Sequence, residues 1–127
     1  MGGTEATVSG FRFTGYQYTN PFIGGPFEKT EDEQDKDLVE LKTMVDHETI
    51  LVTHGPCYGI LDRTGSGMHV GSRALGRFVD SAAPRFHIFG HIHESFGVAG
   101  RSFNVSYPFT GQFVIIDLAD GSYEITV

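Results

Sequence analysis

Two short apolar runs, each with histidine close behind it, constrain this chain more than any other feature. Residues 50–53 lead into His54, and residues 86–89 lead into His91 and His93. Apolar runs of this length are too short for buried helices and are typical of interior strands. We therefore expect two buried strands, each followed closely by histidine.

A helical segment joins the two expected strands. Residues 72–83 carry apolar side chains at helical spacing, and Pro84 ends the helix. A strand, a helix and a second strand form a βαβ unit, whose two strands run parallel. Their carboxyl ends then share one edge of the sheet, where ligands bind in open α/β folds. The pattern predicts that His54, His91 and His93 gather at that edge.

The rest of the chain predicts an α/β fold in which this one βαβ unit is followed by antiparallel strands. Alternating residues over 7–18 indicate a hairpin or two short strands, and residues 33–46 have the period of an amphipathic helix. Residues 55–71 form a long glycine-containing loop, and ordered loops of that length tend to be functional. The tail adds further β-elements, at 97–103, 113–118 and 122–127.

Composition limits the class of protein. The 127 residues suit a single domain spanning 1–127, and a net charge of −7 argues against a nucleic-acid-binding face. The single Cys57 excludes an internal disulfide framework. No apolar run reaches the roughly 18 residues of a membrane span, and no signal pattern is visible. We expect a cytoplasmic protein without membrane contact.

The histidines predict a divalent metal site. Side chains at positions i and i+2 of an extended segment point the same way, so His91 and His93 can face one site. Neutral imidazole binds manganese, iron and zinc well. Because the βαβ unit brings His54 to the same edge, we expect His54, His91 and His93 as metal ligands.

The other histidines are assigned from their positions. His87 alternates with apolar neighbours inside a strand and is expected to be structural. His47 lies at the expected end of the first helix, where it suits the helix dipole, and is also expected to be structural. His69 lies in the long loop and is a candidate to touch substrate.

Three further residues complete the candidates. Asp62 and Glu94 are the acids nearest in sequence to the histidines and could support the metal ligands, although most such acids are simply solvated. Cys57 could act as a nucleophile with His54, three residues away, as its base. Clustered histidines favour metal chemistry over that alternative.

These motifs resemble a known family. The segments Thr53-His54-Gly55-Pro56, Gly59-Ile60-Leu61-Asp62 and Gly90-His91-Ile92-His93-Glu94 are similar to the C-terminal half of calcineurin-like metallophosphoesterases. The resemblance is closest to the class that includes animal metallophosphoesterase-domain brain proteins. Residues 71–75 and 103–106 also fit that class, so the resemblance covers nearly the whole chain.

The resemblance implies a fold, a reaction and a cofactor. The family fold is a β-sandwich flanked by helices, so this chain would be half of that sandwich. Family members hydrolyse phosphate esters, often diesters, because two cations acidify water and hold the phosphoryl oxygens. By motif, His54 and His91 would hold one metal and His93 the other.

The family's acidic motifs are missing from this sequence. Asp-x-His, Gly-Asp-x-x-Asp and Gly-Asn-His-Glu/Asp do not occur. In the family they supply a bridging carboxylate, an asparagine ligand and a histidine that aids the leaving group. We expect a truncated enzyme that binds as few as one ion and needs a complementary N-terminal half or a homo-oligomer to act on a phosphate ester.

Two functions therefore stay open. The first is a phosphoesterase portion that becomes active on assembly. A single-ion site made by His54, His91 and His93 belongs to the same hypothesis, since three histidines and an open position form a known zinc geometry. The second is a metal-binding or scaffold module that keeps the fold without catalysis.

Overall fold

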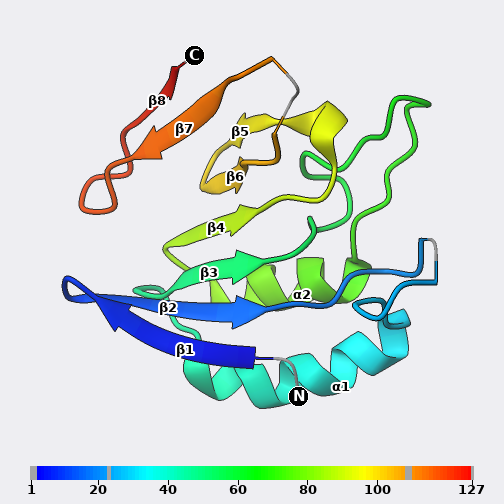
Figure 1. The fold of residues 1–127 in the computed structure, drawn as a ribbon. Coiled ribbons are helices and arrows are strands. Elements are labelled where there is room, and N and C mark those ends of the chain that lie inside the picture. The colour runs from blue at the N-terminus through cyan, green and yellow to red at the C-terminus, as the bar shows by residue number, and fades with distance from the viewer. Residues whose placement is uncertain (1–2, 23, 108–109, 127) are drawn as a thin grey trace.

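The computed structural model describes residues 3–22, 24–107 and 110–126. Strands and helices alternate through most of this range, as Figure 1 shows. The elements in chain order are β1 (Gly3–Val8), β2 (Phe11–Tyr16), α1 (Glu31–Leu41), the 3₁₀ helix η1 (Lys42–Met44), β3 (Ile50–Thr53), α2 (Arg73–Ala82), β4 (Phe86–Phe89), the 3₁₀ helix η2 (His93–Ser95), β5 (Gly97–Ala99), β6 (Ser102–Asn104), β7 (Phe113–Ile116) and β8 (Tyr123–Thr126).

Six of the strands form one mixed sheet. Its order is β1-β2-β3-β4-β6-β5, and β7 with β8 makes a separate two-stranded sheet. The four inner strands all run parallel, while β1 and β5 are antiparallel edges. The carboxyl ends of β2, β3, β4 and β6 therefore meet at a single edge.

The expected βαβ unit is confirmed, as are the expected antiparallel hairpins, but the prediction of a single βαβ unit was wrong. β3, α2 and β4 form that unit, with β3 and β4 parallel. β2, α1 and β3 form a second one, because β2 also pairs with β3 in parallel. The expected purely antiparallel tail is likewise corrected, since β6 joins β4 in parallel. Such pairings are long-range, so local periodicity does not report them.

Capping residues decide where the two helices begin. Thr30 accepts a hydrogen bond from the backbone of Glu33, whose side chain accepts one from the backbone of Thr30, forming a capping box. Helix α1 therefore starts two residues before the predicted 33–46 segment and yields to η1 after Leu41. Ser72 caps α2 in the same way, by accepting from the backbone of Leu75.

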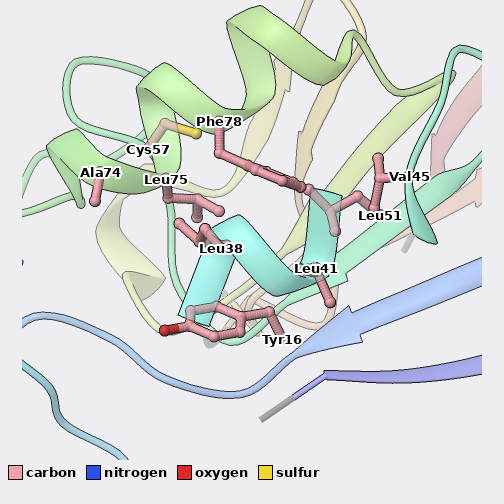
Figure 2. Close-up of a cluster of buried hydrophobic side chains, with 9 residues drawn as sticks. All are labelled: Tyr16, Leu38, Leu41, Val45, Leu51, Cys57, Ala74, Leu75 and Phe78. Carbon is pink, nitrogen blue, oxygen red and sulfur yellow. The ribbon is translucent and has the colours of Figure 1, made fainter. Parts of the chain in front are cut away.

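The main core lies between the helices and one face of the sheet. Figure 2 shows side chains from α1 and α2 converging with Tyr16 and Leu51 of the sheet. Leu41 and Leu51 are completely buried, so this face is well sealed. The buried members are Tyr16, Leu38, Leu41, Val45, Leu51, Cys57, Ala74, Leu75 and Phe78.

A second, smaller cluster lies on the opposite face of the sheet. Ile50, Phe86 and Phe103 form its buried part, and Val114 and Ile116 of β7 pack against it. In Figure 1 the β7–β8 hairpin lies beside the β5–β6 end of the sheet, away from β1. Within the described ranges, no helix has the length and apolar character needed to cross a membrane.

Candidate functional site

Loops from all four parallel strands meet at the carboxyl edge of the sheet. Residues 17–20 follow β2, His54 follows β3, residues 90–93 follow β4, and residues 105–107 follow β6. Each loop position is fixed by the strand before it, because neighbouring strands are hydrogen-bonded in register. This edge is the expected ligand-binding side of such a sheet.

His54 and His91 lie side by side at this edge. Their ring centroids are 5.0 Å apart, and the ring planes cross at 72°. The backbone holds both residues, because the His54 N–H donates to the Tyr16 carbonyl at 3.1 Å and the Gly90 N–H donates to the His54 carbonyl at 3.2 Å. The structure thus brings together the two histidines that the βαβ unit was expected to bring together.

His91 has an unusual backbone conformation. Its φ is +76°, a region that residues with a Cβ rarely adopt and that often marks a functional position. Burial lowers the pKa of His91, and the neighbouring rings of His54 and His93 lower it further, while Glu28 acts in the opposite sense. The neutral imidazole is the form that binds a metal.

His93 is oriented by the loop that follows β6. Its Nδ1 lies 2.5 Å from the carbonyl oxygen of Tyr107. Metal-binding histidines commonly hold their other ring nitrogen against a carbonyl in this way, which fixes the ring. Among the residues that the structure describes, no three His, Cys, Asp or Glu side chains form a group able to hold a metal ion. The assignment of His93 beside the His54–His91 pair stays a prediction.

Asn104 organises the site and was missed from the sequence. Its side-chain amide donates to the carbonyls of Leu61 at 3.0 Å and Ile92 at 2.9 Å, and its Oδ1 accepts from the backbone of Ser106 at 3.0 Å. A fully buried asparagine thus ties the long loop to the histidine segment. The available signal was a polar residue inside the apolar Phe103-Asn104-Val105 stretch.

His87 is buried beneath the site, as expected, and lies in a directional hydrogen-bond chain. The Thr53 hydroxyl donates to the Gly55 carbonyl at 2.7 Å, so it accepts from His87 Nε2, also at 2.7 Å. His87 Nδ1 is then the acceptor that faces the Cys57 thiol at 3.8 Å. Burial lowers the pKa of His87 to about 3, which keeps this ring neutral. This series of hydrogen bonds ends at the Gly55 carbonyl and so holds in place the turn that carries His54.

Cys57 has the properties of a structural residue. It is almost completely buried, and burial, together with the charges of Asp80 and Asp62, raises its pKa to about 12. A thiol with a raised pKa supplies little thiolate at neutral pH, and the thiolate is the nucleophile. The burial and the raised pKa of Cys57 therefore agree with the expectation that metal chemistry is favoured over a cysteine nucleophile.

A hollow of about 200 Å³ adjoins His91. The loop after β2 forms one wall, and the turn after β3 forms another. Gly55 makes this close approach possible, because a Cβ there would lie 2.8 Å from Cγ2 of Thr19. The hollow is lined by Tyr18, Thr19, Asn20, Pro21, Phe22, Gly55, Pro56, Val70, Ser72, Leu75 and His91.

The candidate acids serve the long loop. The fully buried Asp62 accepts from the backbone N–H groups of Gly59 and Gly71, each at 2.9 Å, and its Oδ1 lies 2.5 Å from His69 Nδ1. Glu94 accepts from the backbone of Gly65 at 2.9 Å.

His47 differs from its expected position at a helix end. It lies exposed in a turn beyond η1, because α1 ends earlier than predicted.

Comparison with known proteins identifies relatives over about three quarters of this chain. The chain is 40% identical over 93 residues to a UPF0046 protein from Caenorhabditis elegans, across 72% of this chain and 30% of that protein. It is 38% identical over 98 residues to metallophosphoesterase domain-containing protein 1 from Homo sapiens and from Mus musculus, across 75% of this chain and 29% of theirs. The chain thus spans about three tenths of the length of these relatives. No family model matches it.

Solved structures support the fold. One crystal structure matches 97% of this chain and 51% of its own, with a TM-score of 0.76 at 19% identity. TT1561 of Thermus thermophilus matches 97% of this chain and 56% of its own, with a TM-score of 0.57 at 14% identity. Identities this low speak for the α/β fold alone. The sequence relatives, at 38–40% identity over about three quarters of this chain, support its membership of a metallophosphoesterase-like family.

Proposed function

We propose that this chain is the histidine-bearing portion of a metal-dependent hydrolase of phosphate esters, of the phosphodiesterase or phosphatase type. The observation that carries the proposal is the His54–His91 pair, with ring centroids 5.0 Å apart at the carboxyl edge of four parallel strands. The left-handed backbone of His91 adds support, because strain of this kind clusters at functional sites.

His54 and His91 supply part of the set of ligands that a divalent transition metal needs. His54 and His91 offer two imidazoles, and the buried surroundings of His91 favour its neutral form. No third His, Cys, Asp or Glu side chain of the described residues groups with that pair, so we expect other ligands to complete the site. When bound, manganese, iron or zinc would act as a Lewis acid on a phosphoryl oxygen. The residues seen here would hold and orient the ligands, with Tyr107 fixing His93 and the Thr53–His87 pair bracing the turn of His54.

We further propose that a second polypeptide segment completes the site. The acidic motifs missing from this sequence are what such a segment would bring, as a complementary N-terminal half or as a second copy. The exposed apolar part of the sheet supports this idea, since Val8 is 58% exposed and Val52 is 39% exposed. An added strand layer would complete the sandwich expected for the family, in a protein that we expect to be cytoplasmic.

Manganese binding and hydrolysis test the first proposal together. We expect the chain to bind Mn²⁺ in calorimetry, and to hydrolyse a simple phosphodiester once assembled. His54→Ala and His91→Ala should each lower Mn²⁺ affinity by at least about tenfold, because each removes one ligand. His47→Ala is the matched control, since His47 is exposed in a turn outside the site. Equal Mn²⁺ affinity in all four proteins would contradict a metal role for the pair.

Solution mass tests the second proposal. Sedimentation at several concentrations, with and without Mn²⁺, should show a dimer or larger species if copies complete the site. A strictly monomeric chain without turnover would leave a complementary half as the source of the acidic ligands. Metal binding without turnover in any assembled form would instead favour the scaffold function.

A further inference from the structure

The 55–71 loop carries a small hairpin directly beside the histidine segment. Arg63 and His69 pair across it in an antiparallel bridge, and the Thr64 N–H donates to the Met68 carbonyl at 3.0 Å. The Ser95 hydroxyl donates to the Arg63 carbonyl at 2.6 Å. Because Ser95 lies two residues after His93, the hairpin is held against the segment that carries the metal-site histidines.

His69 is held from behind by a buried carboxylate. Its Nδ1 lies 2.5 Å from Oδ1 of Asp62, which is completely buried, while the His69 side chain is 31% exposed. The other ring nitrogen, Nε2, faces the Arg63 guanidinium, with 3.4 Å between it and Arg63 Nε. The Asp62 carboxylate fixes the ring by accepting from Nδ1, so Nε2 is the acceptor of the Arg63 Nε–H.

Two arginines of this region lack an acidic partner. The ion pairs among described residues join Arg12 to Asp46, Lys29 to Asp37 and Arg77 to Asp35, besides the His69–Asp62 contact. Arg63 contacts His69, and Arg73 stacks on the Tyr58 ring at 3.8 Å from its centroid. Neither side chain forms an ion pair among the described residues, although the chain carries 16 acidic and 9 basic residues.

Four side chains therefore form one continuous row, in the order Arg63, His69, Tyr58, Arg73. The His69 and Tyr58 ring centroids are 5.4 Å apart, and the Arg73 guanidinium covers the Tyr58 ring. We propose that this row is a binding site for a phosphoryl oxyanion, held by the outer nitrogens of the Arg63 guanidinium, whose Nε–H is fixed by Nε2 of His69. Arg73 strengthens the positive field from one ring further along the row.

The chemistry of the row selects an oxyanion over an aromatic ligand. The Tyr58 ring already has the Arg73 guanidinium over it and the His69 ring beside it, so both ring contacts are made within the protein. The planar arginine fork matches phosphate oxygens geometrically, and such charge-assisted hydrogen bonds are strong. Asp80 borders the hollow next to Arg73 and Arg77, which disfavours an anion there and places it on the Arg63 side.

The inference deepens the proposed function, since a phosphate ester bound at the histidine edge could place a second phosphoryl group on this row. The binding site itself does not depend on turnover. Its test is therefore done in the presence of a metal chelator, so that a failure to hydrolyse phosphodiesters leaves the result intact.

The experiment is an NMR titration of the full chain with inorganic phosphate and, separately, with methyl phosphate. We expect the His69 ring signals, assigned with His69→Gln, to shift and saturate. The tighter of the two ligands identifies the source as free phosphate or an ester. Arg63→Gln should weaken binding by at least about tenfold, because it removes a charge-assisted contact. Arg73→Gln should weaken it less.

Arg101→Gln is the matched control, since Arg101 is an exposed arginine in the β5–β6 turn. It should bind as the unmodified chain does. Arg63→Lys keeps the charge without the planar fork and should bind with intermediate affinity. A titration without saturation overturns the proposal, as does equal weakening in Arg63→Gln and Arg101→Gln, which would indicate general charge screening.

Discussion

The two faces of the six-stranded sheet differ in how completely they are covered. On the helix face, Leu41 and Leu51 are fully buried beneath α1 and α2. On the opposite face, Phe103 is buried near the β7–β8 hairpin, yet Val52 is 39% exposed in a central strand. Figure 1 shows the helices along one side of the sheet and the hairpin beside its β5–β6 end.

The difference shows which layer this chain completes by itself. The two successive βαβ units place their helices on the same face of the sheet, so that face is covered by elements of this chain. The second face is apolar across its width, because Val8 pairs with Phe11 and Val52 pairs with Ile88. A surface of this kind, left open by the described residues, is where a further layer would bind.

The largest expected effect on stability is at the helix face of the sheet. Leu51→Ala should lower the free energy of unfolding by about 3 kcal/mol, since a fully buried leucine leaves a cavity that neighbours cannot fill. Urea denaturation measures this change. Val39→Ala, at an exposed position of α1, is the control and should change stability by less than about 0.5 kcal/mol. A small effect of Leu51→Ala would mean that the helix face is loosely packed.

The next largest effect on stability is expected on acidification, through His87 on the helix face of the sheet. His87 is buried with its pKa lowered to about 3, whereas the unfolded chain takes up a proton near pH 6.5. The free energy of unfolding should therefore fall as the pH drops below 6.5, by about 1 kcal/mol per pH unit, until the folded ring itself is protonated near pH 3. Urea denaturation between pH 6 and pH 4 measures the slope.

A matched pair of variants isolates the His87 contribution. His87→Leu removes the titrating ring, so its slope should be flatter than that of the unmodified chain, whatever its absolute stability. His47→Ala removes an exposed histidine and should keep the original slope. Parallel slopes in all three proteins would show that His87 does not remain neutral in the folded state.

A moderate effect is expected where the second face is covered. Val114 of β7 packs against the cluster of Ile50, Phe86 and Phe103, but it is only half-buried. Val114→Ala should therefore lower the free energy of unfolding by about 1 kcal/mol, measured by urea denaturation. A loss as large as that of Leu51→Ala would mean that the two faces are equally important for stability.

The smallest effect on stability is expected at Val52. Val52→Thr keeps the β-branched shape in a partly exposed position, so the free energy of unfolding should change by less than about 0.5 kcal/mol. The same change should weaken any self-association through the open face, measured by sedimentation velocity. Leu51→Thr, one residue earlier, is the comparison, because it places a hydroxyl in the closed core.

Local patterns predicted the elements better than their pairing. The apolar run at β4 and the helical spacing of α2 are properties of consecutive residues, and both elements formed as expected. The parallel pairing of His87 with Ser102 joins distant segments, and nothing within either segment encodes the partner. The early start of α1 was readable from Thr30 and Glu33, but the apolar period begins only at Leu38.

The candidate site shows the same division between features that local patterns predict and features that depend on long-range contacts. His54 and His91 could be brought together from the βαβ pattern, because parallel strands end at a common edge. The partners of Asn104 and Asp62 could not be predicted, since their hydrogen bonds reach loop backbone far away in the sequence or depend on a loop shape. Buried polar side chains are satisfied by the tertiary fold, and periodicity says little about them.

The base of the 55–71 loop offers a place to divide the polypeptide. The Tyr58 and Ser72 N–H groups donate to the carbonyls of Ser72 and Pro56, each at 3.0 Å, and Gly71 lies so close to the Cys57 backbone that no Cβ would fit. The loop is thus closed at its base, while Gly65 to Gly67 are exposed at its tip. A cut at Ser66 would place β3 and β4, which pair as neighbours in the intact chain, on different fragments. His54 would then lie on one fragment and His91 on the other. The two rings would come together only when the mixed fragments reassemble, so their proximity would report reassembly.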